Sequence, residues 1–306
     1  MERKKVLKLG TFPDELQRVI DDELQCYSEE EVVEEAPLRA QIGAIITRSN
    51  YRISPELLCN LPKLRIIATS GVGYDGIPVA AAKERGVVVT NTPGVLDAAV
   101  CELAVGLLLA VLRKIPSMDR HVRSGDWKHG SYPLTTGLSG KRVGIVGLGR
   151  IGHGIAKRLV PFGVEIAYAG RNQALTYRHY NDVQQLADCV DILILSCPGG
   201  PATHHLVNAD VLERLGSQGF LVNVSRGSVV DEAALAAALH NGVIRGAALD
   251  VFESEPLINS PLLHLPNVVF TPHAGSATEE TRRAMLRITL DNIHRVLDGL
   301  DALTPV

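Results

Sequence analysis

A glycine-rich turn between a strand and a helix is the feature of this sequence that most limits its fold. The short apolar run Val143–Val146 leads into Gly147-Leu148-Gly149-Arg150-Ile151-Gly152, and a helical apolar pattern continues to Leu159. Glycines at this spacing allow a tight turn, close approach of the backbone to a pyrophosphate, and close packing of the helix on the strand. The first amides of such a helix can hold phosphate. The segment predicts a dinucleotide site with these cofactor-binding residues: Gly147, Gly149, Arg150, Ile151 and Gly152.

The same glycine spacing occurs once more, at Gly71-Val72-Gly73-Tyr74-Asp75-Gly76. This copy also follows an apolar strand, but Pro78 favours a helix that begins only after the loop. The exposed amides of such a loop suit a small carboxylate better than a pyrophosphate. We therefore predict a substrate-binding loop here, with an ordinary glycine-rich turn as the alternative.

Short apolar runs alternate with helical patterns along most of the chain, which predicts an α/β protein with parallel sheets. Strands are expected at residues 6–9, 42–47, 64–70 and 87–91, and then at 142–146, 164–169, 192–196, 220–224, 246–251 and 268–271. Helices are expected at residues 98–115, 151–159, 232–241 and 279–300. A boundary between two doubly wound units is expected near residue 97, and the last helix is expected to pack back against the first unit.

The length and composition agree with two folded domains and exclude several classes of protein. The 306 residues carry 31 basic and 34 acidic side chains, a net charge of −3, so there is no basic field for nucleic acid or an acidic membrane surface. The five cysteines lack the spacing of a zinc site or a disulfide framework. The apolar run 103–112 is too short to span a bilayer, and the N-terminal residues do not resemble a signal or transit peptide. We therefore predict a soluble, cytoplasmic protein without a metal.

The end of the strand expected at residues 164–169 bears on the choice of cofactor. Enzymes that prefer NAD place an Asp or Glu at this point, against the ribose 2′-hydroxyl. Here Gly170, Arg171 and Asn172 follow the strand, so a carboxylate is absent and a guanidinium is available for a 2′-phosphate. The sequence predicts NADP(H) in preference to NAD(H), with these three as cofactor-binding residues. The alternative is that Arg171 is only a solvated surface charge.

Three polar motifs follow strands of the second unit, where open α/β sheets build their sites. The motifs are residues 222–227, 249–256 and 271–278. They contain Arg226, Glu255 and His273, which we predict to be catalytic. A cation for the substrate's charge, a proton donor and a carboxylate to tune that donor are what the reduction of a 2-oxo acid needs.

These motifs, with the Gly71 loop and Thr90-Asn91-Thr92-Pro93, resemble the D-isomer-specific 2-hydroxyacid dehydrogenase family over nearly the whole chain. The resemblance is strongest to the glyoxylate/hydroxypyruvate reductases and related NADPH-dependent 2-oxo acid reductases. It implies that Arg226 binds the substrate and polarises its keto oxygen, that His273 is the general acid/base, and that Glu255 orients His273. Glu253 is the rival to Glu255, but only Glu255 precedes a proline as the family's catalytic Glu does.

The resemblance implies further contacts with substrate and cofactor. The amides of Val72 and Gly73 would bind the substrate carboxylate, and Asp250 would contact the nicotinamide carboxamide. Trp127 would reach the substrate site of a partner subunit, or else it is simply a core anchor. The remaining residues expected along the cofactor are Val100, Cys197, Pro198, Val224, Ser225, His273 and Gly275.

The expected architecture is a Rossmann cofactor domain, residues 98–282, inserted into a flavodoxin-like substrate domain formed by residues 1–97 and 283–306, with the active site in the cleft between them. The implied function is NADPH-dependent reduction of a short 2-oxo acid of the glyoxylate/hydroxypyruvate class to the D-2-hydroxy acid, in a homodimer. The alternatives are a 2-ketogluconate or hydroxyphenylpyruvate reductase of the same family, or a cofactor-sensing, corepressor-like interaction protein.

The other histidines are interpreted as structural or surface residues. His204 and His205 are adjacent in a segment expected to be extended, so their side chains are expected to point to opposite sides. Neither has partners at metal-ligand spacing, and no zinc role is predicted.

Overall fold

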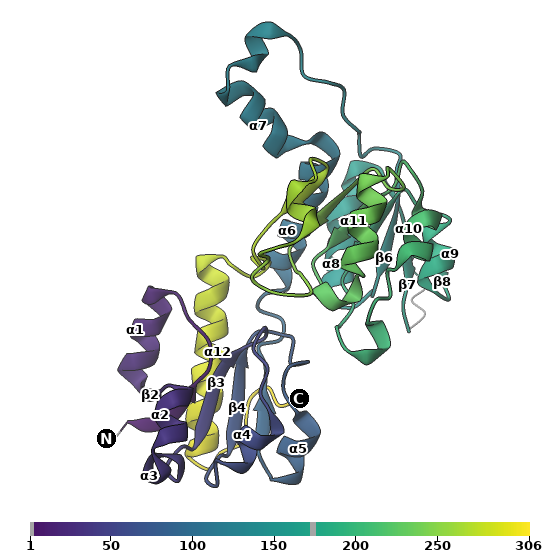
Figure 1. Ribbon diagram of the computed structural model, residues 1–306. Helices are drawn as coiled ribbons and strands as arrows, with labels where there is room; N and C mark the ends of the chain where they lie inside the picture. Colours follow the sequence, from purple (N-terminus) through teal and green to yellow (C-terminus); the bar gives the residue numbers. More distant parts are fainter. Residues whose placement is uncertain (1–2, 172–175) are drawn as a thin grey trace. The chain divides into compact units, whose positions relative to one another are not determined.

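The computed structural model describes residues 3–171 and 176–306 and divides into two compact units (Figure 1). Unit 1 comprises Met1–Leu96 and Ala277–Val306, and unit 2 comprises Asp97–Ser276. Unit 2 is therefore inserted into unit 1 along the chain. The second boundary differs from the expected one between residues 282 and 283, because that position lies inside helix α12 (Glu279–Leu297), which packs in unit 1.

Unit 1 is built on a parallel five-stranded sheet in the order β2-β1-β3-β4-β5. This is the flavodoxin-like strand order. The strands are β1 (Lys4–Lys8), β2 (Leu24–Tyr27), β3 (Ala44–Arg48), β4 (Ile66–Ser70) and β5 (Val88–Thr90). The helices besides α12 are α1 (Asp14–Glu23), α2 (Glu29–Glu34), α3 (Ala36–Arg39), α4 (Pro55–Cys59) and α5 (Val79–Glu84). Every residue of the interior strand β4 is buried, as expected for a parallel sheet covered on both faces.

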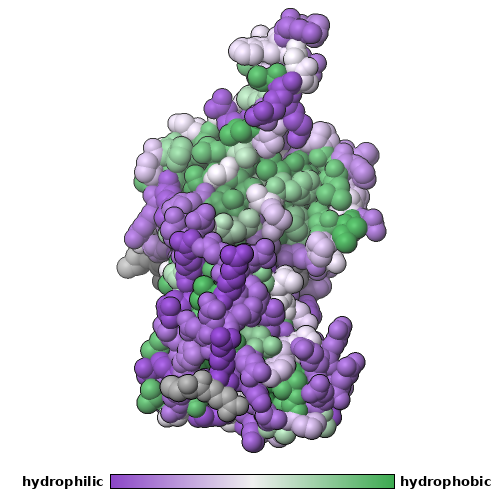
Figure 2. Space-filling model, turned by 90° about the vertical axis from the view of Figure 1, so that its left-hand side faces the viewer, coloured by the Kyte–Doolittle hydropathy of each residue, from purple (hydrophilic) through white to green (hydrophobic). Residues whose placement is uncertain are grey.

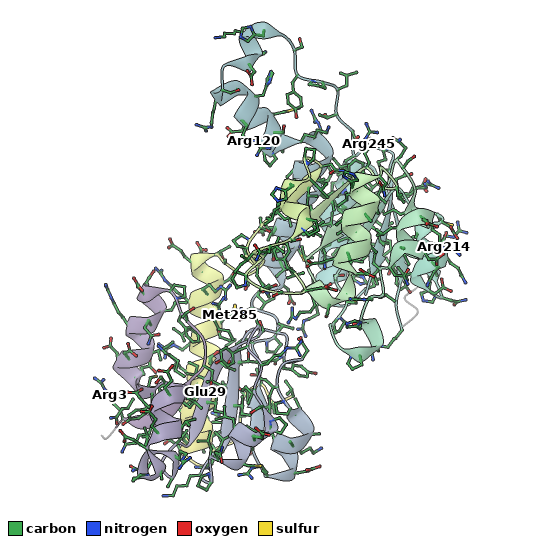
Figure 3. All side chains as sticks on the ribbon, viewed as in Figure 1. Arg3, Glu29, Arg120, Arg214, Arg245 and Met285 are labelled. Atoms are coloured by element: carbon green, nitrogen blue, oxygen red, sulfur yellow. The ribbon has the colours of Figure 1, made fainter. Side chains whose placement is uncertain are left out.

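Helix α12 covers one face of the sheet in unit 1. Its residues Leu286 and Leu290 form one apolar cluster with Ile46 and Ile66 of the sheet, and Met285, labelled in Figure 3, is also buried. The helix begins after Thr278, whose side chain accepts a hydrogen bond from the amide of Thr281. The expected return of this helix to the first unit is therefore observed.

Unit 2 contains a parallel seven-stranded sheet in the order β12-β11-β10-β9-β6-β7-β8. Its strands are β6 (Arg142–Val146), β7 (Glu165–Ala169), β8 (Arg178–Tyr180), β9 (Ile192–Leu195), β10 (Phe220–Asn223), β11 (Gly246–Leu249) and β12 (Val268–Phe270). Its helices are α6 (Asp97–Arg113), α7 (Ile115–Arg123), α8 (Arg150–Leu159), α9 (Val183–Ala187), α10 (Ala209–Leu215) and α11 (Glu232–His240). The strand order reverses at β6, which is the switch point where doubly wound folds bind their ligands.

The predicted fold class, α/β with two doubly wound parallel sheets, is confirmed. The strands that the sequence analysis missed are β2 and β8, which are short edge strands with few buried positions. Helix α7, which has no buried residue and lies in a polar stretch of the sequence, was not expected either. Within residues 3–171 and 176–306, no helix is long and apolar enough to cross a membrane.

Candidate active site

A buried aspartate fixes the turn that carries His273. The carboxylate of Asp250 accepts hydrogen bonds from the amides of Ala274, at 2.7 Å, and Gly275, at 2.9 Å, and from the hydroxyl of Thr271, at 2.6 Å. The amide of His273 in turn donates to the Asp250 carbonyl at 2.8 Å. Burial raises the pKa of the Asp250 carboxyl above its ordinary value, although these hydrogen bonds oppose the shift. Asp250, which follows β11, thus holds the turn that follows β12.

The predicted pair of His273 and Glu255 is in direct contact. Nδ1 of His273 lies 2.7 Å from Oε2 of Glu255, while Oε1 accepts a hydrogen bond from the amide of Phe252 at 3.2 Å. Burial alone would raise the pKa of Glu255, but the hydrogen bond and charge of His273, the Phe252 amide and the charge of Arg226 outweigh it, so the pKa lies below its ordinary value. Glu255 is therefore an ionised partner that fixes Nδ1 as a donor and leaves Nε2 of the ring for a substrate.

Arg226 follows β10 in a turn held by side-chain hydrogen bonds. Oδ1 of the buried Asn223 accepts from the amide and hydroxyl of Ser225, at 3.0 and 2.7 Å, and Nδ2 of Asn223 donates to the Arg226 carbonyl at 3.0 Å. The guanidinium donates to the Ser225 carbonyl at 2.8 Å, and its charge helps to lower the pKa of Glu255. The three predicted catalytic residues thus gather at the carboxyl ends of neighbouring strands.

The glycine-rich turn after β6 has the geometry that a dinucleotide requires. Gly147 has φ of +90°, and a Cβ at Gly152 would lie 2.2 Å from the Gly147 carbonyl oxygen, so both positions need glycine. By contrast, no described atom lies within 4 Å of a Cβ built at Gly149. Helix α8 begins directly after Gly149 without a side-chain cap among the described residues, so its first amides can receive a pyrophosphate.

Other predicted cofactor residues lie in the same unit. Gly275 packs between Asp250 and Val100, since a Cβ there would lie 3.1 Å from the Asp250 carboxylate and 3.3 Å from Val100. Cys197 packs against the glycine turn, since a Cβ built at Gly147 would lie 2.7 Å from the Cα of Cys197. Burial raises the pKa of the Cys197 thiol to about 11. Nε of Arg150 donates a hydrogen bond to the Asp97 carboxylate at 2.9 Å. Val224 and Ser225 are buried. Pro198 and Ile151 are more exposed to solvent.

The turn after β7 carries the residues that bear on the 2′-phosphate. The Gly170 carbonyl lies 3.0 Å from Nε2 of His179, which belongs to the neighbouring strand β8. Arg171 is exposed, while Asn172 lies outside the described residues.

In unit 1, the loop after β4 contains the second glycine motif. A Cβ at Gly71 would lie 2.4 Å from the hydroxyl of Ser49, and one at Gly76 would lie 2.4 Å from the Tyr51 carbonyl. Two of its glycines are therefore required by packing. The Val72 carbonyl accepts a hydrogen bond from the side chain of Asn91 at 2.9 Å, which fixes the loop next to Val72 and Gly73.

Two sequence interpretations are wrong. Trp127 is not a core anchor, because 67% of its surface is exposed. His204 and His205 do not point to opposite sides: their rings stack with centroids 4.0 Å apart, since φ of +49° at His205 interrupts the extended backbone. His205 contacts Glu253, so the two glutamates of the 249–256 motif have different histidine partners.

Comparison with known proteins identifies the family. The family model described as D-isomer specific 2-hydroxyacid dehydrogenase, NAD binding domain, matches residues 105–275. The chain belongs to this family. A hydroxyphenylpyruvate reductase of Plectranthus scutellarioides is 46% identical over 87% of this chain and 85% of its own length. A glyoxylate/hydroxypyruvate reductase of Arabidopsis thaliana is 45% identical over 88% of this chain and 86% of its own.

Solved structures of this family share the fold of the chain. An NADPH-dependent glyoxylate/hydroxypyruvate reductase from Sinorhizobium meliloti, in complex with NADP and malonate, has a TM-score of 0.92 and 42% identity, over 100% of this chain and 97% of the other. The dehydrogenase family assignment and the glycine turn together make unit 2 an NAD(P)-binding domain and the chain an oxidoreductase.

Sequence reasoning missed the residues that support the dehydrogenase site. The role of Asn223 in shaping the Arg226 turn and that of Thr271 in binding Asp250 become visible only in the folded structure. Both are small polar residues at strand ends, a signal shared with many ordinary turns.

Proposed function

We propose that this dehydrogenase reduces a short 2-oxo acid of the glyoxylate/hydroxypyruvate class to the D-2-hydroxy acid, with NADPH as the hydride donor. The observation that carries the proposal is the contact of His273 with Glu255 beside Arg226. A proton donor held by a carboxylate and a permanent cation are what a keto oxygen needs as it gains negative charge.

Each residue of the site has a distinct role in this reaction. NADPH, when bound, supplies the hydride to the carbonyl carbon. His273 donates the proton on Nε2 to the keto oxygen, while Glu255 holds Nδ1 and favours the charged form of the ring. Arg226 binds the substrate carboxylate and polarises the keto oxygen, for which the planar guanidinium offers two parallel donors.

Further contacts are proposed on the resemblance to the family. The amides of Val72 and Gly73 would bind the substrate carboxylate, and Asp250 would contact the carboxamide of the cofactor. The hydrogen bonds that Asp250 already accepts give it a second function, which is to position the His273 turn.

We also propose that NADP(H) is preferred over NAD(H). The support is the sequence after β7, where Gly170 and Arg171 stand in place of a carboxylate and Arg171 is exposed to solvent. The Sinorhizobium meliloti structure contains NADP, which agrees with this choice.

The alternatives are reductases of a larger substrate and a protein whose main role is binding and not catalysis. A 2-ketogluconate or hydroxyphenylpyruvate reductase would use the same three catalytic residues with a larger substrate. A corepressor-like interaction protein would bind the cofactor and would reduce 2-oxo acids only slowly. A cytoplasmic location stays a prediction.

A substrate panel tests the proposal. NADPH consumption is measured with glyoxylate, hydroxypyruvate, 2-ketogluconate and hydroxyphenylpyruvate, and kcat/KM is expected to be highest for one of the two short acids. A value below about 10² M⁻¹ s⁻¹ for all four acids would support the interaction protein instead.

A homodimer is proposed from an arm of unit 2, which we define as residues 115–135. Figure 1 shows that α7 in this arm extends away from the rest of unit 2, and the helix has no buried residue. Four large hydrophobic side chains of the arm are exposed: Ile115, Val122, Trp127 and Leu134, the last at 95%. A segment with this much exposed apolar surface is typical of an interface.

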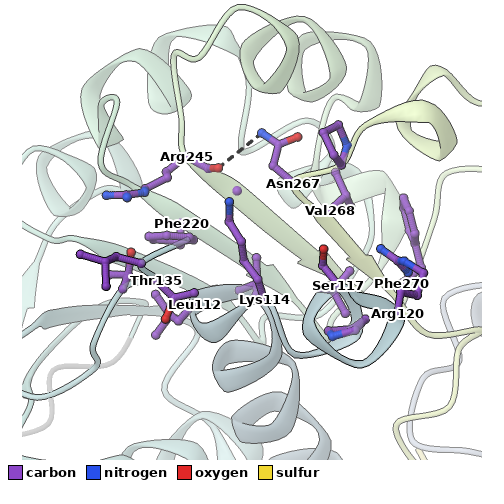
Figure 4. Close-up of a pocket in the computed structure, with 17 residues that line it drawn as sticks. Leu112, Lys114, Ser117, Arg120, Thr135, Phe220, Arg245, Asn267, Val268 and Phe270 are labelled. Carbon is purple, nitrogen blue, oxygen red and sulfur yellow. Dashed lines mark hydrogen bonds between the residues drawn. The ribbon is translucent and has the colours of Figure 1, made fainter. Parts of the chain in front are cut away.

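A pocket beside the base of the arm provides the complementary surface. It has a volume of about 270 Å³ and is lined by polar and apolar residues, the apolar ones including Leu112, Phe220, Val268 and Phe270. Figure 4 shows Lys114 and Ser117 on one side of it and Arg245 and Asn267 on the other, with Arg120, also labelled in Figure 3, at its edge. Figure 2 shows hydrophobic side chains gathered on one face of unit 2. A second copy related by two-fold symmetry would cover both arms and both pockets.

Light scattering of the purified protein tests the dimer. The wild-type chain is expected to be a dimer, and Leu134→Asp in the arm is expected to be monomeric. Leu263→Asp is the matched control, since Leu263 is also exposed but lies in the 3-10 helix η5 (Pro261–His264) and not at the pocket. A monomeric wild-type protein at micromolar concentration would overturn the dimer and, with it, the expectation that Trp127 reaches the substrate site of a partner subunit.

A further inference from the structure

A second histidine–carboxylate pair lies in the same group of strand-end loops as the first. Nε2 of His205 lies 2.5 Å from Oε1 of Glu253, and Nδ1 of His205 lies 3.9 Å from the carboxylate of Asp231. The amide of Glu253 donates to Oε1 of Glu232 at 2.6 Å. Glu253 is therefore held at its side chain by His205 and at its backbone by Glu232.

The loop held in this way is the one that carries Glu255. The neighbouring amide, that of Phe252, donates to the Glu255 carboxylate. On the other side, Gly227 packs so closely that a Cβ there would lie 1.8 Å from the carbonyl carbon of Phe252 and 2.3 Å from the amide nitrogen of Glu253. The Phe252–Glu253 peptide is thus enclosed between the residue after Arg226 and the contacts of His205 and Glu232.

The backbone at His205 is fixed. Its amide donates to the Ser228 carbonyl at 2.8 Å, and Val207 pairs with Val230 in a parallel bridge. Its left-handed φ of +49° is uncommon for a residue other than glycine, and the ring of His204 stacks on it. The backbone from which the His205 side chain reaches Glu253 therefore has a defined position relative to the Arg226 loop.

The carboxylates around the 252–255 loop explain why the loop needs a hydrogen-bond donor at Glu253. Burial raises the pKa of Glu232, and the charges of Glu253 and Glu255 raise it further, against the opposing hydrogen bond from the Glu253 amide. Three carboxyl groups therefore crowd one short loop. Among the described residues, the groups in contact with His205 are the His204 ring, Asp231 and Glu253, so His205 is placed to donate a hydrogen bond to the Glu253 carboxylate.

We infer that His205 is a positioning residue for catalysis: by binding Glu253 it holds the 252–255 loop at the distance from which Glu255 orients His273. The inference rests on the proposed roles of Glu255 and His273. It predicts that losing the His205 donor weakens proton transfer, although His205 is not among the residues proposed to bind substrate or cofactor.

The test compares three variants in the full-length enzyme. His205→Leu removes the donor, and His205→Gln restores an Nε2 donor at a similar reach with a similar backbone cost at positive φ. His204→Leu is the matched control, since it alters the neighbouring ring and leaves the Glu253 contact in place. For each variant, kcat and KM for the 2-oxo acid are measured across pH, together with the Kd for NADPH and the Tm.

The expected result is a loss of kcat of about tenfold in His205→Leu, with little change in KM or in the Kd for NADPH, and a reduction rate that fails at lower pH. His205→Gln should recover most of kcat and the pH profile, and His204→Leu should match the wild type. If His205→Leu keeps the wild-type profile, or if His205→Gln loses as much as His205→Leu, the inference is overturned.

Glu255→Gln is measured beside these variants to separate the inference from the proposed function. A shifted pH profile in Glu255→Gln with an unchanged one in His205→Leu would overturn only the role of His205. An unchanged profile in Glu255→Gln would overturn the roles proposed for Glu255 and His273, and the inference with them.

Discussion

Oε2 of Glu255 lies 2.7 Å from Nδ1 of His273, and each residue comes from a loop at the end of a different strand. The two loops are linked a second time through Asp250, which precedes the Glu255 loop and accepts hydrogen bonds from the turn that contains His273. The pair therefore keeps its geometry through contacts on both of its sides.

Glu255→Gln should lower the pH above which reduction fails. The neutral amide removes the negative charge that lies beside His273 and supports proton donation to the substrate. A loss in kcat of roughly ten- to a hundredfold near neutral pH is expected. The pH dependence of kcat/KM checks this, and an unchanged alkaline limit would indicate that Glu255 is only structural.

The activity expected at acid pH follows from the pKa of Glu255. Because that pKa lies below its ordinary value of 4.5, the carboxylate stays ionised as pH falls through the ordinary range and is protonated only below it. Support of His273 by Glu255 should therefore persist in wild-type enzyme at pH 5. A fall in kcat that begins above pH 5, without loss of secondary structure by circular dichroism, would contradict the assignment.

Arg226→Ala should reduce kcat/KM by on the order of 10²–10³, because it removes charge stabilisation at the keto oxygen and not packing. Arg226→Lys keeps the charge but loses the planar pair of donors, so an intermediate loss is expected. Kinetics with the preferred 2-oxo acid measure both effects, and an unchanged Tm shows that the fold is intact. Near-native activity in Arg226→Ala would refute the assigned site.

The double substitution Gly170→Asp with Arg171→Ala should reverse the cofactor preference. The new carboxylate accepts the ribose 2′-hydroxyl of NADH and repels the 2′-phosphate, while a guanidinium contact to phosphate contributes about 1.5–3 kcal/mol, or roughly ten- to a hundredfold in affinity. The KM values for NADPH and NADH in both proteins provide the measurement. Equal use of the two cofactors by the wild-type enzyme would mean that Arg171 does not bind the 2′-phosphate.

Gly227→Ala should destabilise the protein by about 3 kcal/mol, because its Cβ would overlap the backbone of Phe252. Gly106→Ala is the matched control. Gly106 lies inside α6 with no described atom within 4 Å of the added Cβ, so the substitution should stabilise the helix by about 0.5–1 kcal/mol. Urea unfolding of both variants is the measurement, and similar midpoints would contradict the close packing at Gly227.

The sequence predicted the interior strands well because most of their residues are apolar and buried. Strand β9 (Ile192–Leu195) is an example, with every residue buried. Edge strand β8 contains Arg178 and His179 and has no buried position, so periodicity could not reveal it. Helix α7 was missed for a related reason, since it buries nothing within its own chain.

The candidate site was predictable where a motif carries the chemistry and not where tertiary contacts do. The glycine spacing and the proline after Glu255 are local signals, and the structure brings Glu255, His273 and Arg226 together. The contact between His205 and Glu253 joins residues 48 positions apart and depends on a left-handed backbone conformation at His205. No pattern in the sequence predicts either feature.

The division of unit 1 into two separated segments has a consequence for synthesis. Its sheet is complete once residue 90 has been made, but α12, which covers Ile46 and Ile66, follows only after the whole of unit 2. Unit 2 is continuous and can fold on the ribosome as it emerges, while the face of the N-terminal sheet that α12 will cover has only α1 packed on it throughout that time. Chaperone dependence during translation should therefore centre on the first ninety residues, although they are the earliest to leave the ribosome.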